Sequence, residues 1–239
     1  MKYNNEIKAI FFELDGTLLP MEQSYFISQY FNKLAGFGAT LGIDPEKLID
    51  GTIAGTGAMI HNDGSKTNRE AFWDAYFDFV GEKRADLEEL LDAFYLDGFK
   101  ELREHTFENP MALKMIEVAR GNGRKVVLAT NPVFPMQAQL ERISWLGLKA
   151  EDFDLITSYD NSRYCKPNPE YYREICAKIG VEPENCLMFG NDESDDMKGA
   201  SAAGMECYLI TDHRIMSENF MWMGERGSFD QALKMMERI

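Results

Sequence analysis

Short apolar runs of strand length recur along the chain and give the first prediction of its fold. Each run is rich in β-branched or aromatic side chains and is bounded by polar or turn-forming residues, as expected for a strand buried in a sheet. From the second run onward, segments with helical spacing separate the runs. This alternation predicts parallel strands joined by right-handed helical crossovers. The predicted strands are residues 7–12, 126–129, 153–157, 186–189 and 207–210.

Two of the connecting segments open with the same helix-start signal. Asn109-Pro110 and Asn168-Pro169 each place an N-capping side chain before a proline at the first helical position. Apolar residues at helical spacing follow the first pair, and Gly121 is expected to end that helix.

The first two predicted strands are separated by more than a hundred residues that lack a strand-like pattern. Four or five amphipathic helices are expected there instead. We therefore predict one α/β core, residues 1–19 and 106–239, interrupted by an inserted all-helical domain, residues 20–105. Within the insertion, the glycine-rich stretch of residues 51–57 lacks the Lys-Ser or Lys-Thr of a phosphate-binding loop, and it is interpreted as helix ends and a turn.

Chemically active side chains follow four of the apolar runs directly. Because ligands bind outside the carboxyl ends of the strands in open parallel sheets, these side chains are expected to converge at one edge of the sheet. They are Glu13 and Asp15 after the first run, Thr130 and Asn131 after the second, the segment ending in Lys166 after the third, and Asn191, Asp192, Asp195 and Asp196 after the fourth.

The types of these residues favour phosphoryl transfer. Several carboxylates held close together would repel one another, so a hard cation with oxygen ligands, Mg²⁺, is the expected occupant. A bound divalent ion attracts phosphate, to which Thr130 and Asn131 can donate hydrogen bonds and Lys166 can add a positive charge. Taken singly, Glu13 and Asp15 also fit a solvated Asp-Gly turn, and the acids after the fourth run also fit the N-terminus of a helix. Lys166 taken singly also fits a surface lysine. Their occurrence at successive strand ends favours the functional interpretation.

Charge and cysteine usage limit the remaining possibilities. Lys and Arg number 25 against 40 Asp and Glu, which gives a net charge of −15 without a basic cluster. Binding to nucleic acid or to an anionic membrane is therefore not expected. The four cysteines form no C-x-x-C pair, which argues against a zinc site. No apolar stretch is long enough to span a membrane, and a cytoplasmic protein is expected.

The four segments together resemble the motifs of the haloacid dehalogenase (HAD) superfamily. They read "FFELDGT", "VVLATN", "KPNP" and "FGNDESDDMKGA", and they occur in the order that the superfamily shows. The resemblance implies a Rossmann-like core, and the insertion after the first motif resembles a helical cap of the C1 type. It also implies a Mg²⁺-dependent hydrolase of the phosphatase type that acts on a small phosphorylated metabolite, as a monomer or homodimer.

The resemblance also assigns roles to residues of this sequence. It implies that Glu13 stands at the position of the nucleophile, that Asp15 is the general acid and base, and that Thr130 binds the phosphate. Lys166 would offset the charge of the nucleophile and the phosphoryl group. The implied Mg²⁺ ligands are the carboxylates of Glu13 and Asp192 and the backbone carbonyl of Asp15, with Asp196 in a supporting role.

The sequence departs from the superfamily at residue 13, where Glu replaces the nucleophilic Asp. One additional methylene displaces the carboxylate by up to roughly 1.5 Å, and a misplacement near 1 Å can cost on the order of a hundredfold in rate. Metal binding tolerates the change better than turnover does. The alternative is therefore a weak or silent relative that binds metal or a phosphorylated ligand. A dehalogenase is disfavoured because members with that activity need no metal, whereas Asp15 and Asp192 are both present here. A phosphonate hydrolase is disfavoured because members with that activity lack the second acid.

The insertion contains one loop that could contact a substrate. Residues 60–70 carry His61, Lys66 and Arg69, which could meet an anionic substrate, although a solvated loop between helices is the simpler interpretation. The aromatic residues just after this loop have the helical spacing of core packing rather than that of a ligand-binding cluster. They are Phe72, Trp73, Tyr76, Phe77 and Phe79.

Overall fold

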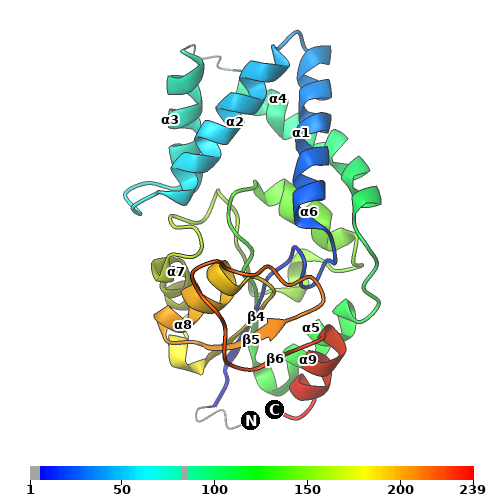
Figure 1. The fold of residues 1–239 in the computed structure, drawn as a ribbon, viewed down its shortest axis with the longest axis vertical. Helices are drawn as coiled ribbons and strands as arrows, with labels where there is room; N and C mark the ends of the chain where they lie inside the picture. Colours follow the sequence, from blue (N-terminus) through cyan, green and yellow to red (C-terminus); the bar gives the residue numbers. More distant parts are fainter. Residues whose placement is uncertain (1–5, 82–85) are drawn as a thin grey trace.

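A six-stranded parallel sheet flanked by helices forms the core of the protein (Figure 1). The computed structural model describes residues 6–81 and 86–239, so the first five residues of the expected core lie outside it. The strands follow one another across the sheet in the order β3-β2-β1-β4-β5-β6, and the prediction of an α/β, Rossmann-like fold is confirmed. Their bounds are β1 Ala9–Phe12, β2 Lys125–Leu128, β3 Leu155–Ile156, β4 Cys186–Gly190, β5 Glu206–Ile210 and β6 Arg226–Gly227.

Strand β1 lies at the centre of the sheet because it is apolar on both faces. All four of its residues are buried, and it pairs in parallel with β2 on one side and β4 on the other. Ile10 and Phe12 face one hydrophobic cluster, and Ala9 and Phe11 face a second. A strand covered on both faces has the continuous apolar pattern that predicted it. All five predicted strands are present, whereas β6, only two residues long, has no sequence pattern to reveal it.

Helices cover both faces of this sheet. Helices α5 and α9 pack against the cluster that contains Ile10 and Phe12, and α7 and α8 pack against the other. The bounds are α5 Ala112–Ala119, α6 Met136–Ser144, α7 Pro169–Ile179, α8 Gly199–Ala203 and α9 Phe229–Met236, with short 3₁₀ turns at η2 Gly121–Gly123, η3 Ala150–Asp152 and η4 Pro183–Asn185. Among the described residues, no helix is both long and apolar enough to cross a membrane.

The two helix-start signals differ in outcome. Asn168 caps α7 as expected, since its side chain accepts a hydrogen bond from Glu170 N. The prediction for Asn109 is displaced by two residues, because α5 begins at Ala112. The Asn109 side chain instead accepts from Met111 N within a turn and donates to the backbone carbonyl of Leu18, 2.9 Å away.

The long interval between β1 and β2 is helical, and we call residues 23–105 the helical insertion. It lies beyond the carboxyl end of the sheet, in the upper part of Figure 1. Among its described residues, helices α2 and α3 make the most extensive contact, and α1 packs on α2 and on η1. Its elements are α1 Gln23–Thr40, α2 Pro45–Ile60, α3 Asn68–Val80, α4 Leu87–Leu96 and the 3₁₀ helix η1 Gly98–His105.

The glycine-rich stretch of residues 51–57 was wrongly predicted as helix ends and a turn, because it lies inside α2. The reason is packing. A Cβ atom on Gly51 would come within 2.6 Å of the Tyr76 ring, and one on Gly55 within 2.5 Å of the Phe72 ring. These glycines therefore allow α3 to approach α2 closely, although glycine normally weakens a helix.

Candidate active site

The loop that follows β1 places Glu13 and Asp15 at the carboxyl end of the sheet. Glu13 N donates to the carbonyl of Phe189 in β4, so the backbone continues the sheet to this residue without a bulge. Gly16 then adopts a left-handed conformation (φ 75°), and a Cβ there would lie 2.4 Å from the Asn191 side chain. The turn "LDGT" is therefore locked against the loop that follows β4.

Hydrogen bonds hold both carboxylate oxygens of Glu13. Its Oε1 turns back to accept a hydrogen bond from Leu14 N at 2.7 Å, and its Oε2 accepts one from Lys166 Nζ. Each carboxylate oxygen has two lone pairs, so neither bond exhausts the oxygen that makes it. Glu13 also lines the acidic cavity described below.

Lys166 is a fully buried cation between two carboxylates. Its ammonium donates to Glu13 and, at 2.6 Å, to Asp196 Oδ1. Burial would by itself lower the pKa of Lys166, but the negative charges of Asp196 and Glu13 outweigh this effect and hold that pKa well above its usual range. Lys166 therefore stays charged and holds the loops after β1, β3 and β4 together.

The loop after β4 is organised around Asp196. The Oδ2 atom of Asp196 accepts hydrogen bonds from Asn191 N and Asp192 N, each at 2.9 Å. Burial raises the pKa of Asp196 to about 7 against the opposing charge of Lys166. The segment Glu193–Lys198, η5, is a single π-helical turn, a form often found at functional sites. Asp192 caps it, since Oδ1 accepts from the backbone N–H groups of the second and third residues after it.

Two polar residues after β2 complete the strand-end set. The backbone carbonyl of Thr130 accepts from the hydroxyls of Thr157 and Tyr171, each at 2.8 Å, which fixes the position of the residue. The Asn131 side chain accepts from Lys166 N and donates to Asp195 Oδ2, both at 3.3 Å. Thr130 and Asn131 both line the acidic cavity.

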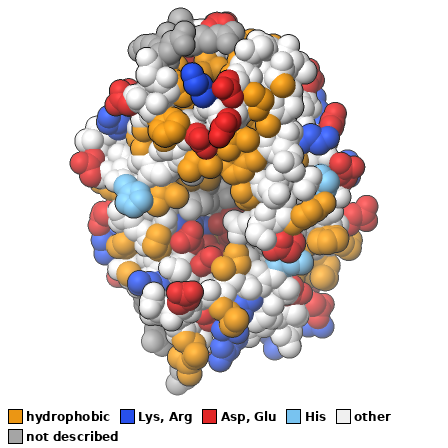
Figure 2. All heavy atoms as spheres, turned by 45° about the horizontal axis from the view of Figure 1, so that its top comes forward, with side chains coloured by type: hydrophobic (Ala, Val, Ile, Leu, Met, Phe, Trp, Pro, Cys, Tyr) orange, Lys and Arg blue, Asp and Glu red, His pale blue; other side chains and the backbone are white. Residues whose placement is uncertain are grey.

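One cavity of about 100 Å³ collects these residues, and we call it the acidic cavity. Of the predicted site residues, only Lys166 is absent from its wall, because Lys166 lies behind Glu13 and Asp196. Figure 2 shows a hollow in this face of the molecule, with hydrophobic side chains on one rim and acidic side chains nearby. The lining residues are Glu13, Asp15, Gln23, Ile27, Thr130, Asn131, Val133, Phe134, Asn191, Asp192, Asp195, Asp196 and Ile215.

Asp15 has a partner that the sequence did not reveal. Its Oδ2 accepts from the guanidinium of Arg142, which is fully buried in α6 and also donates to Gln139 Oε1. The other oxygen, Oδ1, is buried and makes no hydrogen bond within the described part of the chain. Burial raises the pKa of Asp15, and the neighbouring Glu13 adds to this effect, whereas Arg142 opposes it. Gln139 and Arg142 share the buried face of α6 with apolar Ala138 and Ile143. Two polar residues on an otherwise apolar helix face are the sequence signal that could have indicated a buried partner for the site.

The residues of the cavity fit a hard divalent cation. Glu13, Asp15 and Asp192 offer oxygen donors on the same wall, which is the ligand type that Mg²⁺ prefers. In the described residues, no three His, Cys, Asp or Glu side chains lie close enough to hold a metal by themselves. The set implied by the motif resemblance is smaller, two carboxylates and a backbone carbonyl, and Glu13, Asp15 and Asp192 all line the acidic cavity.

The loop of residues 60–70 contacts the core away from the acidic cavity. Arg69 pairs with Asp160 and Glu88, each at 3.0 Å, and Lys66 pairs with Asp74 at 2.8 Å. The backbone N–H groups of Asn68 and Arg69 donate to the carbonyls of Ser162 and Tyr159. The loop does not line the acidic cavity. Several of its residues, His61 among them, are exposed to solvent, and its backbone hydrogen bonds connect the helical insertion to the segment that leads to Lys166.

Comparison with known proteins identifies the family. Residues 7–204 match the haloacid dehalogenase-like hydrolases. A phosphorylated carbohydrates phosphatase of Thermotoga maritima is 27% identical over 84% of this chain and 83% of its own length. A putative phosphatase of Bacillus subtilis is 25% identical over 85% and 83%. The crystal structure of a HAD phosphatase from Thermococcus onnurineus has the same fold, with a TM-score of 0.59 and 21% identity over 96% of this chain and 97% of its own.

The chain therefore belongs to the haloacid dehalogenase-like hydrolase family. The predicted family is confirmed, and the relatives that match it over most of their length are phosphatases, the type of hydrolase that the four motifs indicate.

Proposed function

We propose that this chain is a Mg²⁺-dependent phosphatase of small phosphorylated metabolites in which Glu13 replaces the nucleophilic aspartate. The observation that carries the proposal is the acidic cavity, which is lined by Glu13, Asp15, Thr130 and Asp192, while the buried Lys166 pairs with Glu13. The volume of the cavity is about 100 Å³. Because one water molecule takes up about 30 Å³ in the liquid, this volume is of the order needed by one phosphoryl group and a few waters. The names of the relatives add support, since they include phosphatases of phosphorylated carbohydrates and of phosphoglycolate.

In the proposed first step, a carboxylate oxygen of Glu13 attacks phosphorus while the bond from phosphorus to the leaving-group oxygen breaks. Asp15 gives its proton to that oxygen. In the second step, Asp15 takes a proton from a water that attacks phosphorus, and the bond to Glu13 breaks to release inorganic phosphate. The raised pKa of Asp15 supports this role, because it keeps the carboxyl protonated to higher pH than a solvated aspartate.

The remaining residues position the phosphoryl group and balance its charge. The Thr130 hydroxyl and the Asn131 amide can donate to phosphoryl oxygens, and Lys166 offsets charge on Glu13. Glu13 and Asp192 with the Asp15 carbonyl would hold Mg²⁺, which supplies charge neutralisation at the phosphoryl oxygens. The predicted inserted domain, residues 20–105, would be a cap of the C1 type, and the presence of Gln23 and Ile27 on the wall of the acidic cavity supports this assignment.

A panel of phosphate monoesters tests the proposal. With Mg²⁺ present, the protein is expected to release inorganic phosphate from at least one ester. Excess chelator should lower the rate on the order of a hundredfold or more, because the charge of the ion stabilises the transition state by several kcal/mol. Readdition of Mg²⁺ should restore the rate. Release that continues unchanged in chelator, or no release from any ester, would contradict the proposal.

Arg142 provides a separate test of Asp15. Because the Arg142 charge lowers the pKa of Asp15, Arg142→Gln should raise it, and Arg142→Lys should raise it less. The activity that needs protonated Asp15 is lost as pH rises through this pKa. The alkaline limb of the profile of kcat/KM against pH should therefore move to higher pH in Arg142→Gln.

Arg124 is the matched control for this experiment. It is also buried, but its guanidinium donates to backbone carbonyls at the end of α5 and not to a carboxylate. Arg124→Gln should leave the alkaline limb where it is. An unmoved limb in Arg142→Gln, with turnover retained, would contradict the role given to Asp15.

A silent relative that binds metal or a phosphorylated ligand is the second candidate, and the contacts of Glu13 are the observation that favours it. Both of its oxygens are engaged, one of them by the adjacent backbone N–H. In that case the native protein releases no phosphate from any ester, and Glu13→Asp gains the activity.

A further inference from the structure

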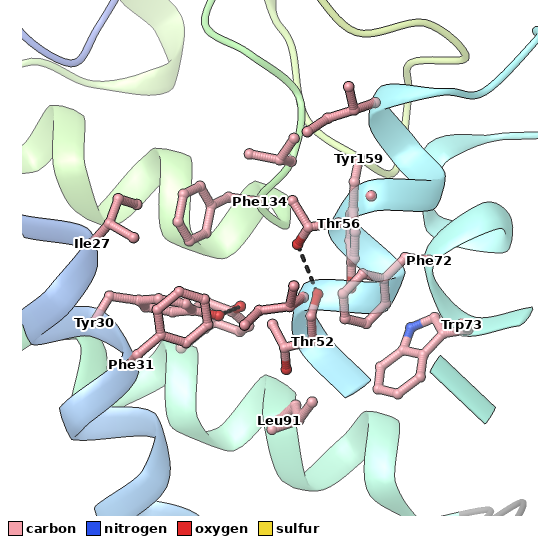
Figure 3. Close-up of a pocket in the computed structure, with 15 residues that line it drawn as sticks. Ile27, Tyr30, Phe31, Thr52, Thr56, Phe72, Trp73, Leu91, Phe134 and Tyr159 are labelled. Carbon is pink, nitrogen blue, oxygen red and sulfur yellow. Dashed lines mark hydrogen bonds between the residues drawn. The ribbon is translucent and has the colours of Figure 1, made fainter. Parts of the chain in front are cut away.

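A second cavity of about 380 Å³ lies between the helical insertion and the core segments that carry Val133, Phe134 and Tyr159 (Figure 3). Ile27, Val133 and Phe134 line both cavities, so the two share a wall. Ile53 and Ile60 are about half exposed and lie where the second cavity meets solvent. We call it the apolar chamber. Apart from the three shared residues, it is lined by Tyr30, Phe31, Thr52, Ile53, Thr56, Gly57, Ile60, Phe72, Trp73, Leu91, Tyr95 and Tyr159.

Most polar groups on the wall of the chamber are already bonded within the protein. The Thr52 hydroxyl donates to the carbonyl of Leu48 at 2.7 Å, and the Thr56 hydroxyl donates to the carbonyl of Thr52 at 2.8 Å. The hydroxyls of Tyr30 and Tyr95 bond to each other at 2.8 Å. A polyhydroxylated group placed here would lose its water without gaining partners, which is costly for each hydroxyl.

Charge is also absent from the wall. Among the described residues that line the chamber, none is Lys, Arg or His. A second phosphate or a carboxylate on the substrate would therefore find no cation there.

From these observations we infer that the apolar chamber binds the leaving group of the substrate, and that this group is an alkyl or aromatic alcohol rather than a sugar or a polyol. This inference rests on the proposed phosphatase function, since it assigns the phosphate to the acidic cavity and the rest of the ester to the chamber. The volume is sufficient, because a cavity of roughly 150 Å³ can hold benzene. Each CH₂ group that leaves water for the chamber should strengthen binding by about fourfold.

A matched pair of esters tests the inference. Hexyl phosphate and sorbitol 6-phosphate carry the same number of carbon atoms and are both esters of primary alcohols, so they differ chiefly in the hydroxyl groups. The value of kcat/KM should be at least tenfold higher for hexyl phosphate. An equal value, or a preference for sorbitol 6-phosphate, would overturn the inference and leave the phosphatase proposal standing.

Filling the chamber should remove this preference. Gly57 lies on its wall in α2, and a Cβ atom at this position meets nothing within 4 Å. Gly57→Phe should lower the ratio of the two kcat/KM values by about tenfold, and Gly57→Ala should lower it less. Gly36→Phe is the control, because Gly36 is exposed on α1, is equally free of contacts and lies outside both cavities. An unchanged ratio in Gly57→Phe would overturn the inference.

A binding measurement separates this inference from the proposed function, because it needs no turnover. Hexylphosphonate should bind at least tenfold more tightly than methylphosphonate in isothermal titration calorimetry, and Gly57→Phe should abolish the difference. This result in a protein without turnover would support the chamber while contradicting the phosphatase. Equal affinities of the two phosphonates would overturn the chamber whatever the turnover.

Discussion

Replacing Glu13 by Gln is expected to lower phosphate release on the order of a thousandfold or more, the usual result of removing a covalent nucleophile. The amide has nearly the same shape as the carboxylate, but its single oxygen can replace only one of the two that accept from Leu14 N and Lys166. Lys166 keeps its pair with Asp196, so the local fold should persist. The amide lacks the negative charge that attacks phosphorus. The measurement is kcat/KM on the best ester of the panel.

Two further variants make this result specific. Glu151→Gln changes an exposed glutamate in the same way and should leave kcat/KM unchanged. Glu13→Asp keeps the carboxylate and shortens its reach, and it should retain measurable release. Release by Glu13→Gln at a rate close to that of the native protein would contradict the role of residue 13 as nucleophile.

Replacing Lys166 by Met should give the largest loss of stability. Removing one partner of a buried ion pair typically costs about 3–5 kcal/mol, because the other charge is left buried without compensation. Here two carboxylates, Glu13 and Asp196, would be left without their shared cation. The free energy of unfolding, measured by urea denaturation, should fall by that amount at pH 8.

The pH dependence of this loss distinguishes electrostatics from packing. Burial raises the pKa of Asp196 to about 7 against the opposing charge of Lys166, so without Lys166 the pKa of Asp196 should rise further in the folded state. The unfolded state then releases this proton more readily. The stability of the variant should then recover as pH falls and Asp196 becomes protonated. Lys66→Met is the control, since its pair with Asp74 is exposed and is worth about 1 kcal/mol at most. A loss of the same size in both variants, or one independent of pH, would contradict the described electrostatics.

Much of the site could be predicted because its residues directly follow the strands that position them. Glu13 and Asp15 come after β1, and Asp192 follows β4 within two residues, so recognising the strands was enough to place the side chains at one edge. The sheet itself was predictable for the same reason, since strands buried on both faces have continuous apolar runs.

Arg142 could not be predicted in this way, because it pairs with a residue 127 positions away. Nothing near Asp15 in the sequence indicates a cation, and only the tertiary packing of α6, which contacts α4 and η1, brings the guanidinium to it. The apolar chamber could not be predicted for the same reason, because residues from several helices and from the core come together to line it. The aromatic residues of α3 were expected to form core packing, and Phe72, Trp73 and Tyr76 are indeed buried, but Phe79 is 56% exposed. Spacing along one helix did not reveal that Phe72 and Trp73 also face a cavity.

The proposed two-step mechanism depends most directly on a covalent bond between Glu13 and phosphorus. Acid quenching during turnover, followed by proteolysis and mass spectrometry, should find one phosphoryl group on the peptide that contains Glu13 in the native protein and none in Glu13→Gln. A native protein that turns over a phosphate ester without ever carrying phosphate on that peptide would contradict the role of Glu13 as nucleophile.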